Sequence, residues 1–230
     1  MMRAKILSGG VAHHFAATSA ALADILAPLG IQSATTDDIE AGLMDGRAVE
    51  LMVFNVFRDA HFSAAYASDV PEPNYSPSAA ARSAILSHLE SGGGLLALHG
   101  AVISFAAWPE WADMLGARWI QGRSGHPKRS PMQMRIVHGS HPVVAGVESY
   151  VLEDDEAYGF LDLAPDVRGV AFSAHGGVDH PMLWLREYRG GRVAYLAPCH
   201  GMTTMSHSSH RRLIARTALW LLRRDAALEA

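Results

Sequence analysis

The chain has 230 residues, of which 49% are hydrophobic and 18% are charged, a balance that excludes global disorder and allows a sizeable buried core. Its formal net charge of -4 comes without a block of lysine or arginine, so no electrostatic footprint for nucleic acid or an anionic membrane is present. We therefore expect neither nucleic acid nor a membrane as a partner.

No linker rich in proline or serine divides the sequence, and we expect a single domain over residues 1–230. The one cysteine, Cys199, cannot form an internal disulfide bond, and the start of the chain lacks the pattern of a secretory signal. The most apolar stretches are too short or too interrupted to span a bilayer. These features predict a cytoplasmic protein.

Apolar runs and helically spaced apolar residues alternate along the first half of the chain. The run at residues 95–98, Leu-Leu-Ala-Leu, has no polar alternation, which is typical of a strand covered by helices on both faces. This alternation predicts an α/β fold, a three-layer sandwich with a mostly parallel central sheet. The expected strands are residues 3–8, 31–35, 49–54 and 95–98, and the expected helices are 15–29 and 78–90.

The pattern changes beyond residue 130, where apolar and polar residues alternate with period two. Residues 132–137 and 167–172 suit half-exposed strands, and residues 181–185 and 192–196 suit the two arms of a hairpin. Helices are expected at residues 108–115 and 208–224, the second ending on two arginines that favour a helix C-terminus.

Histidines follow several of the expected strands. His13 and His14 come after the first strand, His99 comes directly after residues 95–98, and His200 comes after residues 192–196. Because the carboxyl ends of parallel strands meet at one edge of a sheet, these imidazoles should lie near one another in a ligand site. The third strand adds further polar residues at the same edge, namely Asn55, Arg58, Asp59 and His61.

Several short segments resemble, in order, those of the ThuA family of trehalose-utilisation-like proteins. The resemblance covers about half of the chain, and the first 90 residues match mainly in their order of strands and helices. The matching segments are residues 93–101, Trp111, Leu115-Gly116, Gly125-His126-Pro127, residues 141–147, residues 154–158, residues 181–184, residues 191–195 and His200-Gly201.

The resemblance implies a flavodoxin-like fold related to class I glutamine amidotransferases, and an association with carbohydrate use. Such a likeness does not carry the chemistry with it. Amidotransferases of this fold place a cysteine nucleophile on a tight turn, whereas the corresponding turn here contains His99 and Gly100 without Cys or Ser. We therefore expect no glutaminase activity, and we expect Cys199 to be buried and inert.

The resemblance and the strand ends together select the candidate acid–base residues. The acidic run at residues 154–156 could be a solvated turn, but it matches an acidic pair of the family, so we expect Glu156 to point inward and leave Asp155 open. His126 lies in a loop and suits either a site or a surface. The candidates are His99, His200, Glu156 and His126.

A divalent metal is a further hypothesis, because imidazole and carboxylate ligands suit Zn, Mn or Fe. The tentative ligands are His13, His99 and His200, although their spacing matches no local signature such as His-Glu-x-x-His. His207 and His210 are expected to face solvent, and His141 to belong to a structural turn before a proline.

The leading hypothesis is an enzyme that acts on a small sugar or keto-sugar through histidine and carboxylate groups. Trp108, Trp111 or Tyr158 could stack on the sugar, although such residues also suit the core. The alternative is a non-catalytic sugar-binding or scaffold protein that lacks the nucleophile. A homo-oligomer that shares its pocket between subunits stays open, with residues 66–75 as a lid or interface segment.

Overall fold

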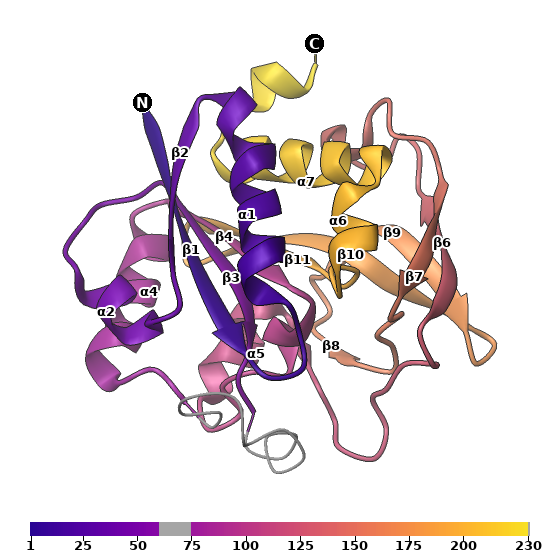
Figure 1. The fold of residues 1–230 in the computed structure, drawn as a ribbon, viewed down its shortest axis with the longest axis horizontal. Helices are drawn as coiled ribbons and strands as arrows, with labels where there is room; N and C mark the ends of the chain where they lie inside the picture. Colours follow the sequence, from indigo (N-terminus) through magenta and orange to yellow (C-terminus); the bar gives the residue numbers. More distant parts are fainter. Residues whose placement is uncertain (60–74, 230) are drawn as a thin grey trace.

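The structure, a computed structural model, describes residues 1–59 and 75–229 (Figure 1). Within them, nine strands form one sheet in the order β2-β1-β3-β4-β11-β10-β9-β6-β7. Its first five strands run parallel, in the order that flavodoxin-like folds share. They are β2 (Ile31–Thr36), β1 (Met2–Gly10), β3 (Leu51–Phe57), β4 (Gly94–Leu98) and β11 (Gly191–Leu196). The predicted α/β class is confirmed.

Four strands extend the sheet in an antiparallel manner. The predicted hairpin joins β10 to β11, with Leu183 opposite Leu196. The period-two runs are the strands β6 and β9, as their alternation predicts. The four strands are β10 (Val178–Tyr188), β9 (Arg168–His175), β6 (Ser130–Ile136) and β7 (Tyr150–Asp155), and the short strands β5 (Ala117–Arg118) and β8 (Asp162–Leu163) pair separately.

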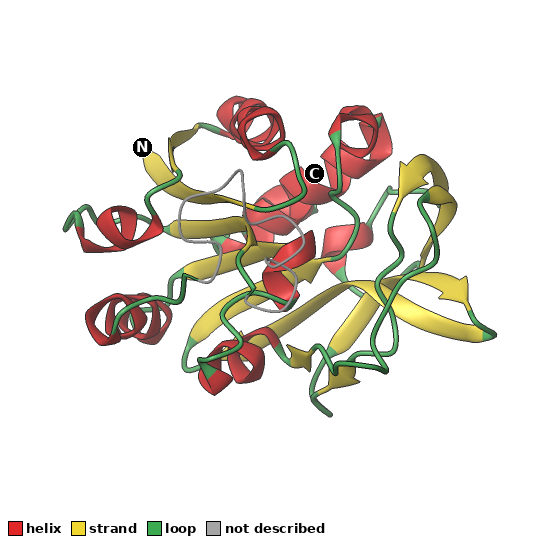
Figure 2. Cartoon of the chain, turned by 60° about the horizontal axis from the view of Figure 1, so that its bottom comes forward, coloured by secondary structure: helices red, strands yellow, loops and turns green. Residues whose placement is uncertain are grey.

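Helices cover the sheet on both sides, as Figure 2 shows. On one face lie α1 (Phe15–Leu26), α6 (Met202–Ser206) and α7 (Ser208–Leu221). On the other lie α2 (Ile39–Met44), α4 (Ala79–Glu90) and α5 (Pro109–Leu115). Short 3₁₀ turns complete the layers, namely η1 (Ala27–Leu29), η2 (His99–Val102), η3 (Pro142–Val144) and η4 (Asp225–Leu228).

The core lies on both faces of the parallel strands. Every residue of β3 and of β4 is buried, which explains why residues 95–98 show no polar alternation. Helix α1 buries Leu22, Ile25 and Leu26 at helical spacing. The predicted helix over residues 15–29 continues past Leu26 only as a 3₁₀ turn, because Pro28 has no amide hydrogen for a further α-helical bond.

No helix in the described part of the chain is long and apolar enough to cross a membrane. The segment from residue 66 to 75, expected as a lid or interface, lies outside the described residues except for Tyr75, and so does His61. Tyr75 itself donates a 2.5 Å hydrogen bond to Glu40 at the start of α2.

Candidate functional site

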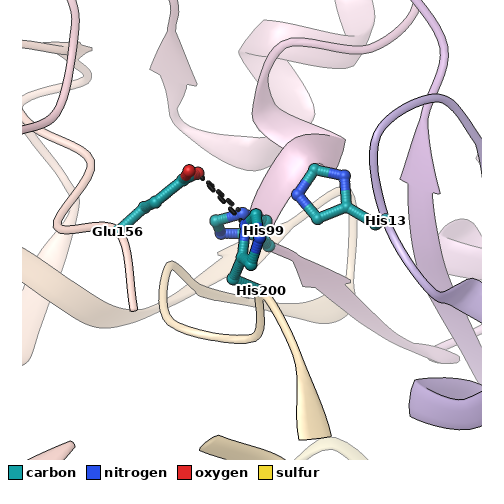
Figure 3. A group of neighbouring side chains, drawn as sticks. All are labelled: His13, His99, Glu156 and His200. Carbon is teal, nitrogen blue, oxygen red and sulfur yellow. Dashed lines mark ion pairs between the residues drawn. The ribbon is translucent and has the colours of Figure 1, made fainter. Parts of the chain in front are cut away.

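Three strand ends bring three imidazoles together (Figure 3). His13 follows β1, His99 follows β4 directly, and His200 follows β11. The ring centroids lie 4.9 Å apart for His13 and His99, 4.5 Å for His13 and His200, and 5.4 Å for His99 and His200. The position of these histidines at the carboxyl edge of parallel strands in one sheet therefore places them in one cluster.

Glu156 reaches the same cluster from the antiparallel half of the sheet, one residue beyond β7. Its Oε2 atom lies 3.3 Å from His99 Nε2, 3.4 Å from His200 Nδ1 and 3.7 Å from His126 Nε2. Burial alone would raise the pKa of Glu156, but its contacts with His200 and His99 lower that pKa below the usual value. The carboxylate thus points inward and is ionised at neutral pH.

His99 occupies a strained turn between β4 and η2. Its φ of 46° lies in the left-handed region, which is uncommon for a residue with a side chain. Two hydrogen bonds hold it there, one with Tyr195 of β11 and one with Ala197 directly after that strand: Nδ1 donates to the carbonyl of Ala197 at 2.7 Å, and the Tyr195 hydroxyl donates to the carbonyl of His99 at 2.9 Å. In the neutral ring, the Nε2 atom is therefore the lone-pair nitrogen, and it faces Glu156.

His13 is held in a similar way. Its Nδ1 donates to the carbonyl of Val11 at 3.0 Å, which leaves the Nε2 lone pair directed to the cluster. Burial and the repulsion from His99 lower the pKa of His13 to about 3. The imidazole is consequently neutral, which is the form that binds metals.

Asp155 lies beneath His200 and is 1% exposed. Its carboxylate accepts hydrogen bonds from the amide of His200 at 3.2 Å, from the amide of Glu156 at 2.7 Å and from the hydroxyl of Thr204. The residue left open by the sequence is therefore a buried support for two members of the cluster. At the outer edge of His200, Arg129 donates from Nη1 to Nε2 at 2.9 Å.

A cavity of about 540 Å³ opens over the cluster. His99 is 3% exposed and forms the layer beneath it. Tyr158 packs between two imidazoles, 4.4 Å from the His99 ring and 5.2 Å from the His126 ring. The cavity is lined by Ala12, His13, Phe57, Ile103, Trp119, Ser124, Gly125, His126, Arg129, Glu156, Tyr158 and His200.

Two of the three aromatic residues suggested for sugar stacking lie in the core, which was the other expectation for them. Trp108 and Trp111 are 3% and 1% exposed and lie in the core, where the indole of Trp111 donates to the carbonyl of Ala101. Tyr158 is buried but lines the cavity, with the His99 and His126 rings packed against it. Trp119, which the sequence did not single out, is the half-buried tryptophan on the cavity wall.

The remaining strand-end residues lie around the cluster. The buried Asn55 amide donates to the hydroxyls of Thr18 and Ser19. Arg58 lines a second cavity of about 650 Å³, which shares the wall residue His13 with the first. Asp59 is buried as well. His14 is exposed at the start of α1.

Two other histidines have structural positions. His141 accepts a hydrogen bond from the amide of Val143 and caps η3, as the turn hypothesis expects. The expectation that His210 faces solvent is wrong: it is fully buried, 2.8 Å from the Tyr150 hydroxyl and 3.7 Å from Cys199 Sγ. His207 is half-buried and stacks on Tyr150. Burial raises the pKa of Cys199, so its thiol stays protonated.

The donor atoms of the cluster fit a divalent metal. One nitrogen each from His13, His99 and His200 and one oxygen from Glu156 lie within 4.8 Å of one another. The three nitrogens are buried, and within the described chain none of them has a hydrogen-bond partner, because the carboxylate contacts are not aligned as hydrogen bonds. A set of imidazoles and a carboxylate suits Zn, Mn or Fe.

Comparison with known families agrees with the fold and the order of the motifs. The sequence profile of ThuA, described as trehalose utilisation, matches residues 3–221. The chain belongs to the ThuA family. No curated protein sequence showed significant similarity to it.

Solved structures show the same fold at low sequence identity. A ThuA-like protein from Parabacteroides merdae superposes with a TM-score of 0.77 and 17% identity, covering 96% of this chain and 90% of that one. A cytoplasmic protein from Salmonella typhimurium gives a TM-score of 0.65 and 16% identity over 96% and 99% of the two chains. A β-galactosidase from Rahnella sp. R3 gives 0.55 and 14%, covering 95% of this ThuA-family chain but 31% of that one.

Proposed function

We propose that this ThuA-family protein is an enzyme that transfers protons on a small sugar or keto-sugar, at a site that takes a divalent metal such as Zn, Mn or Fe. The observation that supports it is the convergence of three imidazoles and one ionised carboxylate beneath a cavity. Because the family is described by trehalose utilisation, we infer that the ligand is a sugar.

The residues divide into metal-holding and proton-transferring groups. His13 and His99 offer Nε2 lone pairs and Glu156 offers an ionised oxygen, and His200 lies close enough to them to serve either group. A bound metal would polarise a hydroxyl or carbonyl oxygen of the sugar as a Lewis acid. The lowered pKa of Glu156 suits a ligand and an orienting group better than a base, so proton transfer falls to the imidazoles of His200 and His126.

The sugar would lie in the cavity above His99. Trp119 would provide the apolar wall for one face of the ring, and Ser124, Arg129 and His126 would provide hydrogen-bonding groups around its edge. Because a neighbouring structure is described as a cytoplasmic protein and Cys199 has no partner for a disulfide, we infer a cytoplasmic location.

Elemental analysis of protein purified without a histidine tag tests the metal. We expect Zn, Mn or Fe in about stoichiometric amount, and its loss in the double variant His99→Ala, His200→Ala. The single variant His138→Ala, which removes an exposed imidazole outside the cluster, is the matched control. Metal-free wild-type protein that also fails to take up Zn²⁺, Mn²⁺ or Fe²⁺ on titration would contradict the metal assignment.

Proton exchange tests the reaction even when the product has not been identified. The protein is incubated in D₂O with small sugars, disaccharides and their keto derivatives, and ¹H NMR follows deuterium entering carbon positions next to the carbonyl. We expect exchange that depends on His200. Binding of a sugar without any exchange or conversion would instead favour the alternative, a non-catalytic sugar-binding protein with the same fold.

A further inference from the structure

Arg129 contacts the nitrogen of His200 that points away from Glu156. Its Nη1 lies 2.9 Å from His200 Nε2, and a guanidinium group donates hydrogen bonds but cannot accept them. Nε2 must therefore carry the lone pair. Since a neutral imidazole has one N–H group, the proton of neutral His200 lies on Nδ1, the atom 3.4 Å from Glu156 Oε2.

Asp154 holds Arg129 in this position. Its two carboxylate oxygens contact two different nitrogens of the guanidinium, Nε at 3.1 Å and Nη2. Such a two-point contact fixes the plane of the guanidinium as well as its position. Asp154 is therefore the residue that aims Arg129 at His200.

The arrangement around His200 is the opposite of that around the other two imidazoles. The Nδ1 atoms of His13 and His99 face backbone carbonyls, which only accept hydrogen bonds, so both rings present lone pairs to the cluster. His200 faces a donor and therefore presents its proton. Ligation of a metal through Nδ1 would require that proton on Nε2, where it conflicts with Arg129.

We propose that Arg129 is a positioning residue that fixes the proton of neutral His200 on Nδ1, and so keeps His200 as a proton donor and leaves metal binding to His13, His99 and Glu156. This inference rests on the proposed function, because it assigns roles within the same site. Of the four residues in the cluster, three would bind the metal and His200 would transfer the proton.

NMR of the metal-free, ¹⁵N-labelled full chain tests the position of the proton directly. Long-range ¹H–¹⁵N correlation distinguishes protonated from unprotonated ring nitrogens, and comparison with His200→Gln assigns the His200 signals. We expect Nδ1 to be protonated in the wild type and Nε2 in Arg129→Met. Arg135→Met, which removes an exposed arginine paired with Asp179, should leave the His200 signals as in the wild type. A proton on Nε2 in the wild type would overturn the inference.

Zn²⁺ titration by calorimetry gives a second measurement. Without Arg129, the proton of His200 can move to Nε2, and the lone pair on Nδ1 becomes available to a metal. Arg129→Met should therefore bind Zn²⁺ about tenfold more tightly than the wild type. Substitutions of groups that contact a metal ligand change metal affinity by about this factor. Equal or weaker binding would contradict the inference. If the wild type binds no Zn²⁺, the metal in the proposed function fails, while the NMR spectrum still decides where the proton lies.

Discussion

Each imidazole of the cluster is held at the nitrogen that points away from Glu156. Backbone carbonyls of Val11 and Ala197 hold His13 and His99, and the Arg129 guanidinium holds His200. Such outer contacts fix both the ring orientation and the position of the proton, which an imidazole alone leaves open. At the scale of single residues, the orientation of the three imidazoles thus depends on groups that lie outside the cluster.

The charge of Glu156 can be removed without changing its size. We expect Glu156→Gln to lower the rate of proton exchange by about 100-fold or more, because the cluster loses the ionised oxygen that faces its imidazoles and would ligate the metal. The same NMR exchange assay measures this. Glu153→Gln, an exposed residue of β7, is the control, and an unchanged rate in Glu156→Gln would contradict the assigned role.

The buried carboxylate of Asp155 accepts three hydrogen bonds. Asp155→Asn replaces one acceptor oxygen by a donor that would face amide and hydroxyl hydrogens. We expect the free energy of unfolding to fall by about 1–3 kcal/mol, the cost of leaving buried polar groups without partners. Urea unfolding measures it, and stability equal to that of Glu153→Gln would show that Asp155 is dispensable.

At the scale of elements, the turn from β4 into η2 decides where His99 lies. Gly100 packs so closely on β3 that an added Cβ would lie 2.8 Å from Phe57 Cβ and 3.0 Å from the carbonyl of Val56. The left-handed backbone at His99 is the result of this close approach combined with its hydrogen bonds to Tyr195 and Ala197.

Gly100→Ala should therefore push η2 away from β3. We expect a loss of about 1–3 kcal/mol in unfolding free energy, the usual cost of overpacking, together with weaker metal uptake because His99 moves with the turn. Urea unfolding and elemental analysis measure the two effects. In Gly125→Ala the added Cβ meets nothing within 4 Å, so stability should stay near the wild type. Equal stability of both variants would contradict this account.

The strands that carry the imidazoles could be predicted from sequence because they are continuous apolar runs. The prediction that the imidazoles lie together followed from the shared carboxyl edge of parallel strands, and β4 and β11 are indeed neighbours. Helix α2 was missed because its six residues are too few to show a helical period. Strand β7 was missed because its acidic end reads as a turn, and only its pairing with β6 makes it a strand.

At the scale of the whole molecule, His210 joins three elements. It extends from α7 to Tyr150 of β7 and to Cys199 beyond β11, and it is fully buried. Burial lowers the pKa of His210 to about 3, whereas the unfolded chain has the ordinary value of 6.5. The unfolded state therefore takes up a proton first as the pH falls, and stability is lost between about pH 6.5 and 3.

We expect His210 to account for about 2 kcal/mol of the stability lost between pH 7.5 and pH 5. Urea unfolding at both pH values measures the difference, and His210→Gln should lose correspondingly less on acidification, even if its stability at pH 7.5 is lower. His138→Gln, at an exposed position, should keep the wild-type pH dependence. An equal loss in all three proteins would contradict this assignment.

Several residues of the site could not be predicted from sequence patterns alone. Glu156 was expected to point inward because of the family resemblance, since spacing alone equally favoured a solvated turn. Arg129 and Asp154 are partly exposed charges without any period, so nothing in the sequence joins them to His200. Trp119 lies in a loop after β5, where no pattern separates a cavity wall from a surface.

The contacts of this site also restrict the length of β7. The last two residues of β7 and the residue after it reach His200 in different ways: Asp154 through Arg129, Asp155 through the backbone amide, and Glu156 through Nδ1. Because neighbouring residues of a strand point to opposite faces, deleting one residue would exchange these roles and leave a carboxylate on the wrong side. Insertions and deletions compatible with the site must therefore fall in loops that carry none of its residues, such as the turn between β10 and β11, and not in β7.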